Sequence, residues 1–336
     1  MNTNPLSRRA FIQASSAGLA AAVLAGNGTA MEAAPAWEKR FKLSNAASVR
    51  MLQFTDVHFF NGINKWTKEE EERKRQNTVD DMRRLVDHAK PDLLLVTGDF
   101  WHENPDGRGP EFMAFAVEQC AALGIPWSFA WGNHDSLDDE SVGHKALAEA
   151  TGSLYAGAAN DGNHVISLED ASGTLLAQIF CLNTKKTGLQ EEARDFLRQA
   201  AVCNVADERP MRLAACHIPL RHYKYVWEQN IASGIIGEVV CSEQEDGSSL
   251  NVLCDAGIQA LFCGHDHVND YSGAMEGVEL IYGRATGHAG YGAEKVPKGG
   301  KLYTLDPARK ALEWVSLLPD GTSWAPKPGE RIENWD

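Results

Sequence analysis

Short apolar runs alternate with amphipathic stretches along the first half of the chain. The segments VRMLQFTDVH (49–58), DLLLVTGD (92–99) and IPWSFAWGNHD (125–135) each begin as apolar strands and end in polar residues. Between the first two, residues 68–89 are rich in helix formers, and their apolar side chains fall on one stripe, as in an amphipathic helix. Residues 111–123 give a second helical pattern, which Gly124 ends.

The rhythm changes in the second half of the chain. Residues 164–170 and 174–183 are joined by Ala-Ser-Gly and predict a hairpin. The other expected elements are helices at 142–150 and 189–201, strands at 211–217 and 257–263, and antiparallel strands at 277–284, 300–306 and 311–318. Strands that first alternate with helices and then follow one another predict an α/β sandwich around one or two mixed sheets.

Composition fits a large globular core. The chain has 336 residues, of which 43% are hydrophobic and 23% charged, and no Pro/Ser/Gly-rich linker divides the body into two domains. The net charge of −14 and the absence of a block of Lys and Arg argue against a nucleic-acid partner, because such a chain repels a phosphate backbone.

The amino terminus resembles an export signal. Arg8 and Arg9 stand two residues before Phe11, an Ala-rich apolar stretch follows at 14–25, and small residues surround position 30. This pattern is similar to the twin-arginine signal, with the general secretory route as the alternative. It predicts a periplasmic or secreted protein that engages the twin-arginine export machinery and has no stable membrane span after cleavage. Loss of residues 1–30 removes both arginines and no acid, so the charge becomes −16.

Seven cysteines are spread along the chain without any C-x-x-C motif. Most stand inside apolar runs, so buried free thiols are expected, although an oxidising compartment permits one or two disulfides. The domain organisation that we expect is a signal peptide at 1–30, an N-terminal extension at 31–47, one main domain at 48–320 and a C-terminal tail at 321–336.

Five apolar strands end in the same way, with Asp, Asn or His directly after them. In open α/β sheets such side chains converge at the carboxyl ends of the strands. Together, the imidazole, carboxylate and amide ligands of five strand ends are too many for one metal ion and suit two. The absence of Cys among them argues against a structural zinc site. The five motifs are T-D-V-H (Asp56, His58), T-G-D (Asp99), G-N-H-D (Asn133, His134, Asp135), C-H-I-P (His217) and G-H-D-H (His265, His267).

In this order, the five motifs resemble those of the calcineurin-like metallophosphoesterase family. The resemblance implies a four-layer αββα sandwich of two mixed β-sheets, with a dimetal site at the strand ends. Carried onto this chain, the resemblance implies that Asp99 bridges two metal ions. Mn, Fe and Zn are all compatible with such a set of imidazole and carboxylate ligands. The first ion would be held by Asp56, His58 and His267, and the second by Asn133, His217 and His265.

Within the family, GDFW, AWGNHD, CGHDHVNDY and GRATGHAGYG resemble the purple-acid-phosphatase-like or Dcr2-like branch. True purple acid phosphatases have a Tyr ligand three residues after the bridging Asp and begin with D-x-G. This chain has His102 and His58 at those two places. The resemblance therefore implies a colourless dimetal site without tyrosinate.

The expected activity is hydrolysis of small-molecule phosphomonoesters or phosphodiesters by attack of a metal-bridging hydroxide. His134 would donate to the leaving oxygen, and Asp135 would hold its tautomer. Further candidates for contact with substrate or with the ligands are His102, His222, His288 and Arg284. The alternatives are a nuclease of the same family and a non-catalytic metal-bearing binding or scaffold protein.

Overall fold

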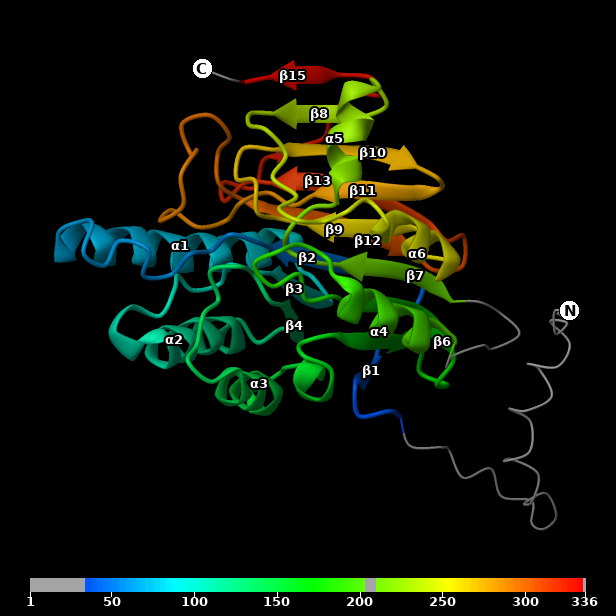
Figure 1. The fold of residues 1–336 in the computed structure, drawn as a ribbon, viewed down its shortest axis with the longest axis horizontal. Coiled ribbons are helices and arrows are strands. Elements are labelled where there is room, and N and C mark those ends of the chain that lie inside the picture. The colour runs from blue at the N-terminus through cyan, green and yellow to red at the C-terminus, as the bar shows by residue number, and fades with distance from the viewer. Residues whose placement is uncertain (1–33, 203–209, 335–336) are drawn as a thin grey trace, which may run out of the picture. The chain divides into compact units, whose positions relative to one another are not determined.

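The computed structural model describes residues 34–202 and 210–334, which belong to one compact unit, Ala34–Asp336 (Figure 1). The predicted signal peptide, residues 1–30, lies outside the described residues.

The smaller of two β-sheets has six strands, in the order β14-β13-β12-β2-β3-β4. Strands β2, β3 and β4 are parallel, whereas β12 runs antiparallel to β2 and is followed by antiparallel β13 and β14, so the sheet is mixed. The bounds are β2 Val49–Phe54, β3 Leu93–Thr97, β4 Trp127–Ala130, β12 Gly300–Asp306, β13 Ala311–Leu317 and β14 Ser323–Trp324.

The larger sheet has nine strands, in the order β1-β5-β6-β7-β9-β11-β10-β8-β15. Strands β6, β7, β9 and β11 form a parallel centre, and antiparallel pairs flank it, so this sheet is mixed too. The bounds are β1 Glu38–Lys42, β5 His164–Glu169, β6 Leu175–Cys181, β7 Met211–Ala215, β8 Ser233–Ile236, β9 Ala260–Cys263, β10 Asp270–Met275, β11 Val278–Tyr282 and β15 Arg331–Glu333.

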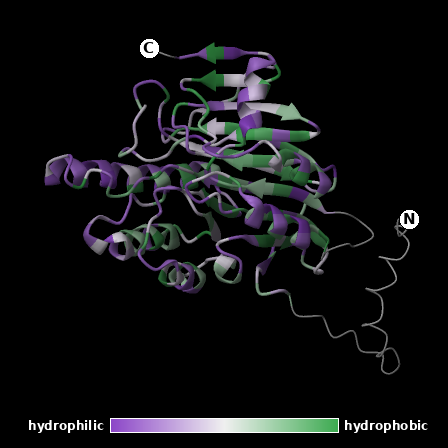
Figure 2. Ribbon diagram, viewed as in Figure 1, coloured by the Kyte–Doolittle hydropathy of each residue, from purple (hydrophilic) through white to green (hydrophobic). Residues whose placement is uncertain are grey.

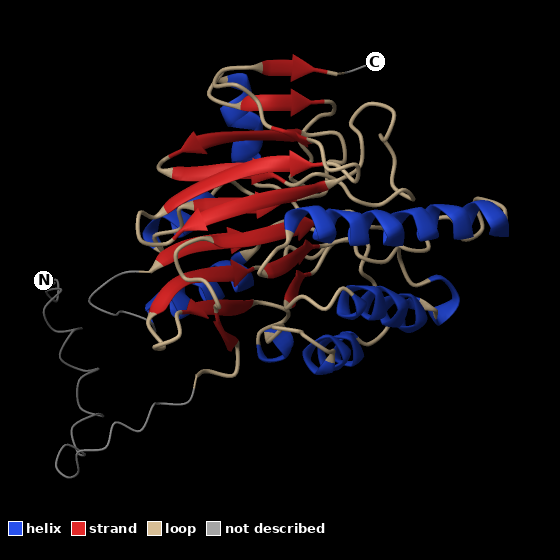
Figure 3. Ribbon diagram, turned by 180° about the vertical axis from the view of Figure 1, so that it is seen from behind, coloured by secondary structure: helices blue, strands red, loops and turns tan. Residues whose placement is uncertain are grey.

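Helices cover the outer face of each sheet. Helices α4, α5 and α6 lie against the nine-stranded sheet (Figure 1), and Figure 3 shows α1, α2 and α3 grouped together when the molecule is seen from behind. The bounds are α1 Lys68–Ala89, α2 Gly109–Ala122, α3 Glu140–Glu149, α4 Glu191–Val202, α5 Arg221–Glu228 and α6 Ser249–Asp255, with short 3₁₀ turns at Pro105–Gly107 and Gly157–Ala159.

Successive side chains of each strand point to opposite faces of its sheet, and the interior is therefore divided into three cores. In β3, Leu93 and Leu95 pack between the two sheets, whereas Leu94 and Val96 pack against α1 and α2. This follows from the two-residue period of a strand, and both faces of β3 are buried. With a third core under α4, α5 and α6, the layers are helix, sheet, sheet and helix. The predicted αββα sandwich is confirmed.

Helix α1 shows how local chemistry sets the limits of an element. Thr67 caps its start by accepting the backbone N–H of Glu70, and three glutamates in the first turn complement the helix dipole. Its end is capped by Lys90, in the left-handed conformation at φ 44°, directly before Pro91. Figure 2 shows the resulting contrast between this largely hydrophilic helix and the hydrophobic strands.

The strands and helices expected from the sequence are present, but several short strands were missed. Strand β1 pairs with β5, and β15 pairs with β8, so the expected N-terminal extension and C-terminal tail both contribute strands to the larger sheet. The sheets therefore extend beyond the expected limits of residues 48 and 320. Within the part of the chain that the structure describes, no helix is long and apolar enough to cross a membrane.

The described cysteines are free thiols, in agreement with the expectation from their apolar surroundings. Four of them are buried, Cys254 is partly exposed and Cys241 is exposed, whereas Cys203 lies outside the described residues.

Candidate functional site

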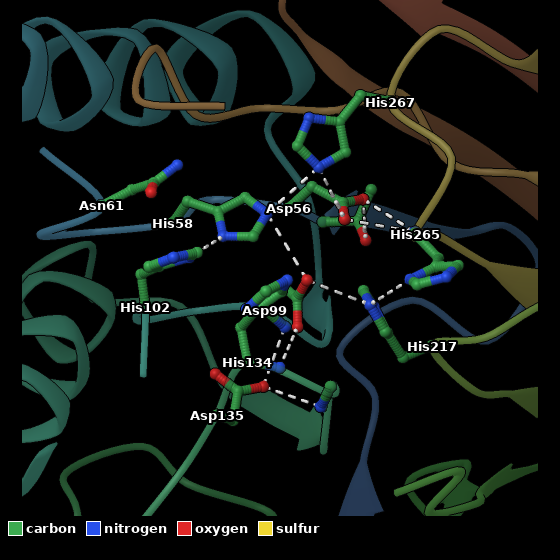
Figure 4. A network of polar contacts seen from close by, with 12 residues as sticks. Asp56, His58, Asn61, Asp99, His102, His134, Asp135, His217, His265 and His267 are labelled. Carbon is green, nitrogen blue, oxygen red and sulfur yellow. Dashed lines mark hydrogen bonds and ion pairs between the residues drawn. The ribbon is translucent and has the colours of Figure 1, made fainter. Parts of the chain in front are cut away.

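The polar residues that follow the strands meet at one edge of the two sheets (Figure 4). Asp56 and His58 follow β2, Asp99 follows β3, and Asn133 follows β4, all in the six-stranded sheet. The remaining three ligand candidates come from the nine-stranded sheet, since His217 follows β7 and His265 and His267 follow β9. Convergence at the carboxyl ends of the strands is therefore confirmed, and both sheets take part.

Asp56, His58 and His267 form the first half of the site. Each has a ligand atom within 4.8 Å of those of the other two, and all three residues are buried. His58 Nε2 lies 3.0 Å from His267 Nε2, which in turn lies 3.4 Å from Asp56 Oδ1. Three donors that point at one another in this way define a position for a cation.

Asp99, His217 and His265 form the second half, with the same limit of 4.8 Å between ligand atoms. His265 Nδ1 lies 3.3 Å from His217 Nε2, and Asp99 Oδ2 lies 3.2 Å from the same nitrogen. The side-chain oxygen of Asn133 is buried without a hydrogen-bond partner. A buried amide oxygen without a partner is costly in a protein, and a cation would compensate it.

Asp99 joins the two halves. Its Oδ2 atom lies 3.4 Å from His58 Nε2 on one side and 3.2 Å from His217 Nε2 on the other. Its second oxygen accepts the backbone N–H of His134 at 2.9 Å. One carboxylate oxygen thus faces both sets of donors, as the bridging role requires.

Strained backbone accompanies the ligand candidates. Asp56, His58, Asp99 and His265 all have φ between 51° and 76°, a region that residues other than glycine rarely adopt. Each such residue costs about 1–3 kcal/mol and persists where the surrounding structure holds it, which happens most often at functional sites. The chain therefore accepts strain here in order to turn these side chains toward one centre.

Outer contacts fix the orientation of the imidazoles. His217 Nδ1 lies 2.8 Å from the carbonyl oxygen of Thr97, so Nδ1 carries the proton and Nε2 is left for a metal. His267 Nδ1 faces the carbonyl oxygen of Tyr291 at 3.4 Å. Gly264 lets this loop approach β2, because a Cβ there would lie only 1.9 Å from Thr55 Oγ1.

Electrostatics also match a site that holds cations. Burial favours the neutral form of Asp99, but the imidazoles of His217 and His58 outweigh it and hold the pKa of Asp99 well below its usual value. Burial lowers the pKa of His217, yet Asp99 overcomes it and raises that pKa to about 10. Burial and His217 lower the pKa of His265 to about 4. An ionised carboxylate that attracts protons to its neighbours attracts metal ions for the same reason.

The donor set therefore fits a pair of metal ions. Nitrogen and oxygen ligands without sulfur suit Mn, Fe or Zn. The buried side-chain oxygen of Asn133 receives no hydrogen bond from the described residues, so it can coordinate an ion. A family model for the calcineurin-like phosphoesterases matches residues 49–269, the segment that contains every one of these donors. The chain belongs to the calcineurin-like phosphoesterase family.

Relatives of this chain include plant and yeast proteins. It is 26% identical over 311 residues to a protein named probable inactive purple acid phosphatase 28 from Arabidopsis thaliana, with 80% of this chain and 78% of the relative covered. It is 23% identical over 269 residues to phosphatase DCR2 from Saccharomyces cerevisiae, with 69% and 46% covered.

Solved structures share the fold. A dimetal phosphatase from Danio rerio superposes with a TM-score of 0.52 at 12% identity, covering 80% of this chain and 95% of that one. A purple acid phosphatase from yellow lupin (Lupinus luteus) seeds superposes with a TM-score of 0.50 at 13% identity, covering 87% and 55%.

The structure places His134 beside the candidate metal centre, with a partner that the sequence did not predict. Its Nδ1 lies 2.7 Å from Oε1 of Glu103, and a carboxylate only accepts, so Nδ1 is protonated and Nε2 is left for another contact. Glu103 also accepts from Ser136 Oγ at 3.2 Å, and its pKa is lowered because these contacts and Lys186 outweigh the effect of burial.

Asp135 has a different contact from the one expected. Within the described residues no contact joins its carboxylate to the His134 ring. The carboxylate accepts the backbone N–H groups of Gly132, Asp99, Phe100 and Trp101 at 2.7–3.1 Å, and it is buried. Burial and the charge of Asp99 raise the pKa of Asp135 to about 7. Asp135 therefore positions the loop that carries Asp99, and Glu103 takes the place expected for it beside His134.

Of the four further candidates, only His102 contacts the centre. Its ring stacks on His134 with centroids 4.4 Å apart, and its Nδ1 lies 3.1 Å from His58 Nδ1. Burial and His134 lower the pKa of His102 to about 4, so the ring is neutral near pH 7. His102 thus separates a ligand candidate from the proposed acid.

The other three candidates lie elsewhere. Arg284 is 4% exposed and pairs with Asp270. His288 Nε2 lies 2.7 Å from Asp81 Oδ2 and joins its loop to α1. His222 lies in α5, where its ring contacts that of Tyr225. None of the three has a contact with a ligand side chain among the described residues.

Glu103 and Tyr291 also lie beside the centre. The sequence suggests Tyr291 as a weaker candidate for phosphate contact, whereas it gives Glu103 no role. The Tyr291 ring stacks on His267, with centroids 4.1 Å apart, and its hydroxyl donates to Glu238 at 2.8 Å. Glu103 follows the end of β3 by six residues, so its distance from that strand end could have suggested it.

Proposed function

We propose that this chain is an exported dimetal phosphoesterase that hydrolyses phosphomonoesters or phosphodiesters of small molecules. The observation that carries the proposal is the pair of donor sets that share Asp99, together with the partnerless oxygen of Asn133. Two bound ions would activate water and neutralise charge on the phosphoryl oxygens. The residues that would hold them are Asp56, His58, Asp99, Asn133, His217, His265 and His267.

The leaving oxygen needs a proton donor, and His134 is the residue placed to supply it. Its Nδ1–H is engaged by Glu103, and its side chain is 32% exposed, so Nε2 is open to substrate. The ring that donates through Nε2 carries both protons and returns to the single-proton form after transfer. Glu103 is a positioning residue in this scheme, because it acts through the imidazole.

A pocket lined by Glu103, the partner of His134, and by Asn133 gives room for the leaving group. It has a volume of about 580 Å³, which suits a small molecule. It is lined by Asn133 of the metal centre, by Glu103, and by the rim residues Asp138, Glu140 and Lys186, among others. The lining combines apolar residues with charged residues of both signs, which supports a small substrate more than a long polyanion.

Two alternatives compete with this proposal. The first alternative is a metal-bearing protein without catalysis. It is suggested by the names of several relatives, which are called probable inactive purple acid phosphatases. Against that reading, this chain keeps every expected ligand together with the His134–Glu103 pair. A family nuclease is opposed by the net charge of −14, since a nuclease needs a surface that attracts phosphates.

Assays of purified protein with nitrophenyl phosphate and bis(nitrophenyl) phosphate test the function. Metal-dependent hydrolysis of either ester, lost in Asp99→Asn, is the expected result. Lack of hydrolysis by fully metal-loaded protein would instead support the non-catalytic alternative.

A further inference from the structure

We infer a third, accessory cation site at the rim of the dimetal centre, formed by Cys241, Glu243 and His265 and suited to a soft divalent ion. The thiol sulfur, a carboxylate oxygen and an imidazole nitrogen of these residues lie within 4.8 Å of one another. Cys241 and Glu243 are exposed, so the site opens to solvent. The inference goes beyond the proposed phosphoesterase function, since it adds a ligand that hydrolysis does not require.

The two nitrogens of His265 face different ways. Nδ1 lies 3.3 Å from His217 Nε2, on the side of the dimetal centre. Nε2 faces Oε1 of Glu243 at 3.7 Å, on the side of the rim. One imidazole can therefore serve an ion of the centre through Nδ1 and a rim ion through Nε2.

The rim is short of positive charge. Glu243 accepts from the Cys241 thiol at 3.2 Å, and no Lys or Arg pairs with it in the part of the chain that the structure describes. The nearby carboxylate of Asp266 accepts from the Cys241 backbone N–H and from the Tyr282 hydroxyl, again with no basic partner among the described residues. Glu243 is therefore an exposed carboxylate without a basic partner, which makes this corner attractive to a cation.

The segment that carries Cys241 is tied to the segment that carries the metal ligands. The backbone N–H of Cys241 lies 3.3 and 3.2 Å from the two oxygens of Asp266, the residue between the two motif histidines. Asn269 Oδ1 accepts the N–H groups of Gly237 and Glu238 at 3.0 and 3.2 Å. Cys241 and the segment of His265 are thus held near one another before any ion arrives, which reduces the cost of binding.

Sulfur sets the preference of the site. A thiolate beside an imidazole and a carboxylate selects Zn²⁺ or Cd²⁺ over Mg²⁺ or Ca²⁺, and water would complete the coordination. Binding displaces the thiol proton of Cys241 and the Nε2 proton of His265 to solvent. The seven donors assigned to the dimetal centre contain no sulfur, so thiolate coordination would report the rim site alone.

Cadmium titration of the metal-loaded protein tests the inference. We expect an ultraviolet cadmium–thiolate absorption that saturates in the wild type and is lost in Cys241→Ser. Cys254→Ser is the matched control, because Cys254 lies in α6 and is partly exposed; it should keep the absorption. Glu243→Gln should raise the Kd for Cd²⁺ about 10- to 100-fold, the range seen when even an outer partner of a metal site is removed.

An absorption that persists in Cys241→Ser, or one that disappears in Cys254→Ser, would overturn the site. Shared use of His265 further predicts that Cd²⁺ slows phosphoester turnover in the wild type and not in Cys241→Ser. Unchanged turnover at saturating absorption would overturn the sharing. Because the absorption needs no turnover, a chain that hydrolyses no ester would count against the proposed function and leave this test intact.

Discussion

Asp99 faces both halves of the metal centre through one oxygen, whereas His58 belongs to the first half. We therefore expect Asp99→Ala to remove phosphoesterase activity more completely than His58→Ala, because the first change weakens both ion positions and the second weakens one. Measured kcat values and metal content of the two variants check this. Equal or inverted losses would mean that the bridging role is misassigned.

His134→Ala should bind metal normally but hydrolyse poor leaving groups slowly. An alkoxide needs a proton as it leaves, so we expect a loss of about 10²–10⁴-fold on an alkyl phosphoester. A nitrophenolate is stable as an anion, so its ester should lose much less. Loss of metal in this variant would instead make His134 a ligand.

Glu103→Gln provides the companion test of positioning. Gln can still accept from His134 Nδ1 but carries no charge, so the alkyl ester should again suffer more than the nitrophenyl ester, by a smaller factor than in His134→Ala. Glu111→Gln is the matched control, because Glu111 is an exposed carboxylate in α2 that pairs with Arg108. A uniform loss on both esters would give Glu103 a structural role only.

The sequence predicted the ligand residues well because each of them directly follows an apolar strand. The direction of the strand alone then places the side chain at the carboxyl edge of the sheet. It did not predict the partners of Arg284 and Glu103, because these contacts depend on which distant residue lies opposite. Arg284 meets Asp270 across the β11–β10 end of the larger sheet, and Glu103 meets His134 from a neighbouring loop. Neither partner can be read from spacing along the chain.

At the scale of elements, a buried charge cluster joins the two sheets. Asp270 begins β10 in the nine-stranded sheet, while Lys301 and Ser316 lie in β12 and β13 of the six-stranded one. Asp270 pairs with Lys301 and with Arg284, and it accepts from Ser316 Oγ at 2.7 Å. Burial raises the pKa of Asp270, but Lys301 and Arg284 outweigh it, so the pKa is lowered overall.

Asp270→Asn should therefore lower the free energy of unfolding by about 3–5 kcal/mol, because it leaves two buried cations without a counter-charge. Urea unfolding at pH 7 measures this. Asp320→Asn at an exposed turn is the control and should change stability by less than about 0.5 kcal/mol. Adding Lys301→Met to Asp270→Asn should restore part of the loss.

The same cluster has a pH signature. A lowered folded pKa means that the contribution of Asp270 is present above its unfolded pKa of about 3.9 and is lost as pH falls through the folded value. The stability gap between wild type and Asp270→Asn should thus shrink in acid. A gap that stays constant down to pH 2 would show that the carboxylate charge does not stabilise the sheets.

The prediction of helices and strands succeeded where a hydrophobic pattern repeats over many residues, and it failed for short strands at the edges of the larger sheet. The helix expected at 68–89 has those same limits, because its apolar stripe, its Thr67 cap and Pro91 agree. Strands β1 and β15 were missed because EKRFK and RIE are short and charged, as edge strands often are to prevent pairing between molecules. Their place in the sheet comes from partners more than 90 residues away.

At the scale of the whole molecule, export is the first property to test. Replacing Arg8 and Arg9 by Lys should leave the precursor in the cytoplasm, because the twin-arginine machinery recognises the pair itself and not its charge. Arg83→Lys with Arg84→Lys, on the exposed side of α1, is the control and should not affect export. Normal export of the double-Lys signal would indicate the general secretory route.

The account rests above all on a pair of metal ions held by one chain. The most direct measurement is elemental analysis of active, undialysed protein beside the Asp99→Ala variant. We predict two ions per chain in the wild type, with Mn, Fe or Zn as the elements, and fewer in Asp99→Ala. One ion or none in fully active wild-type protein would contradict the dimetal centre.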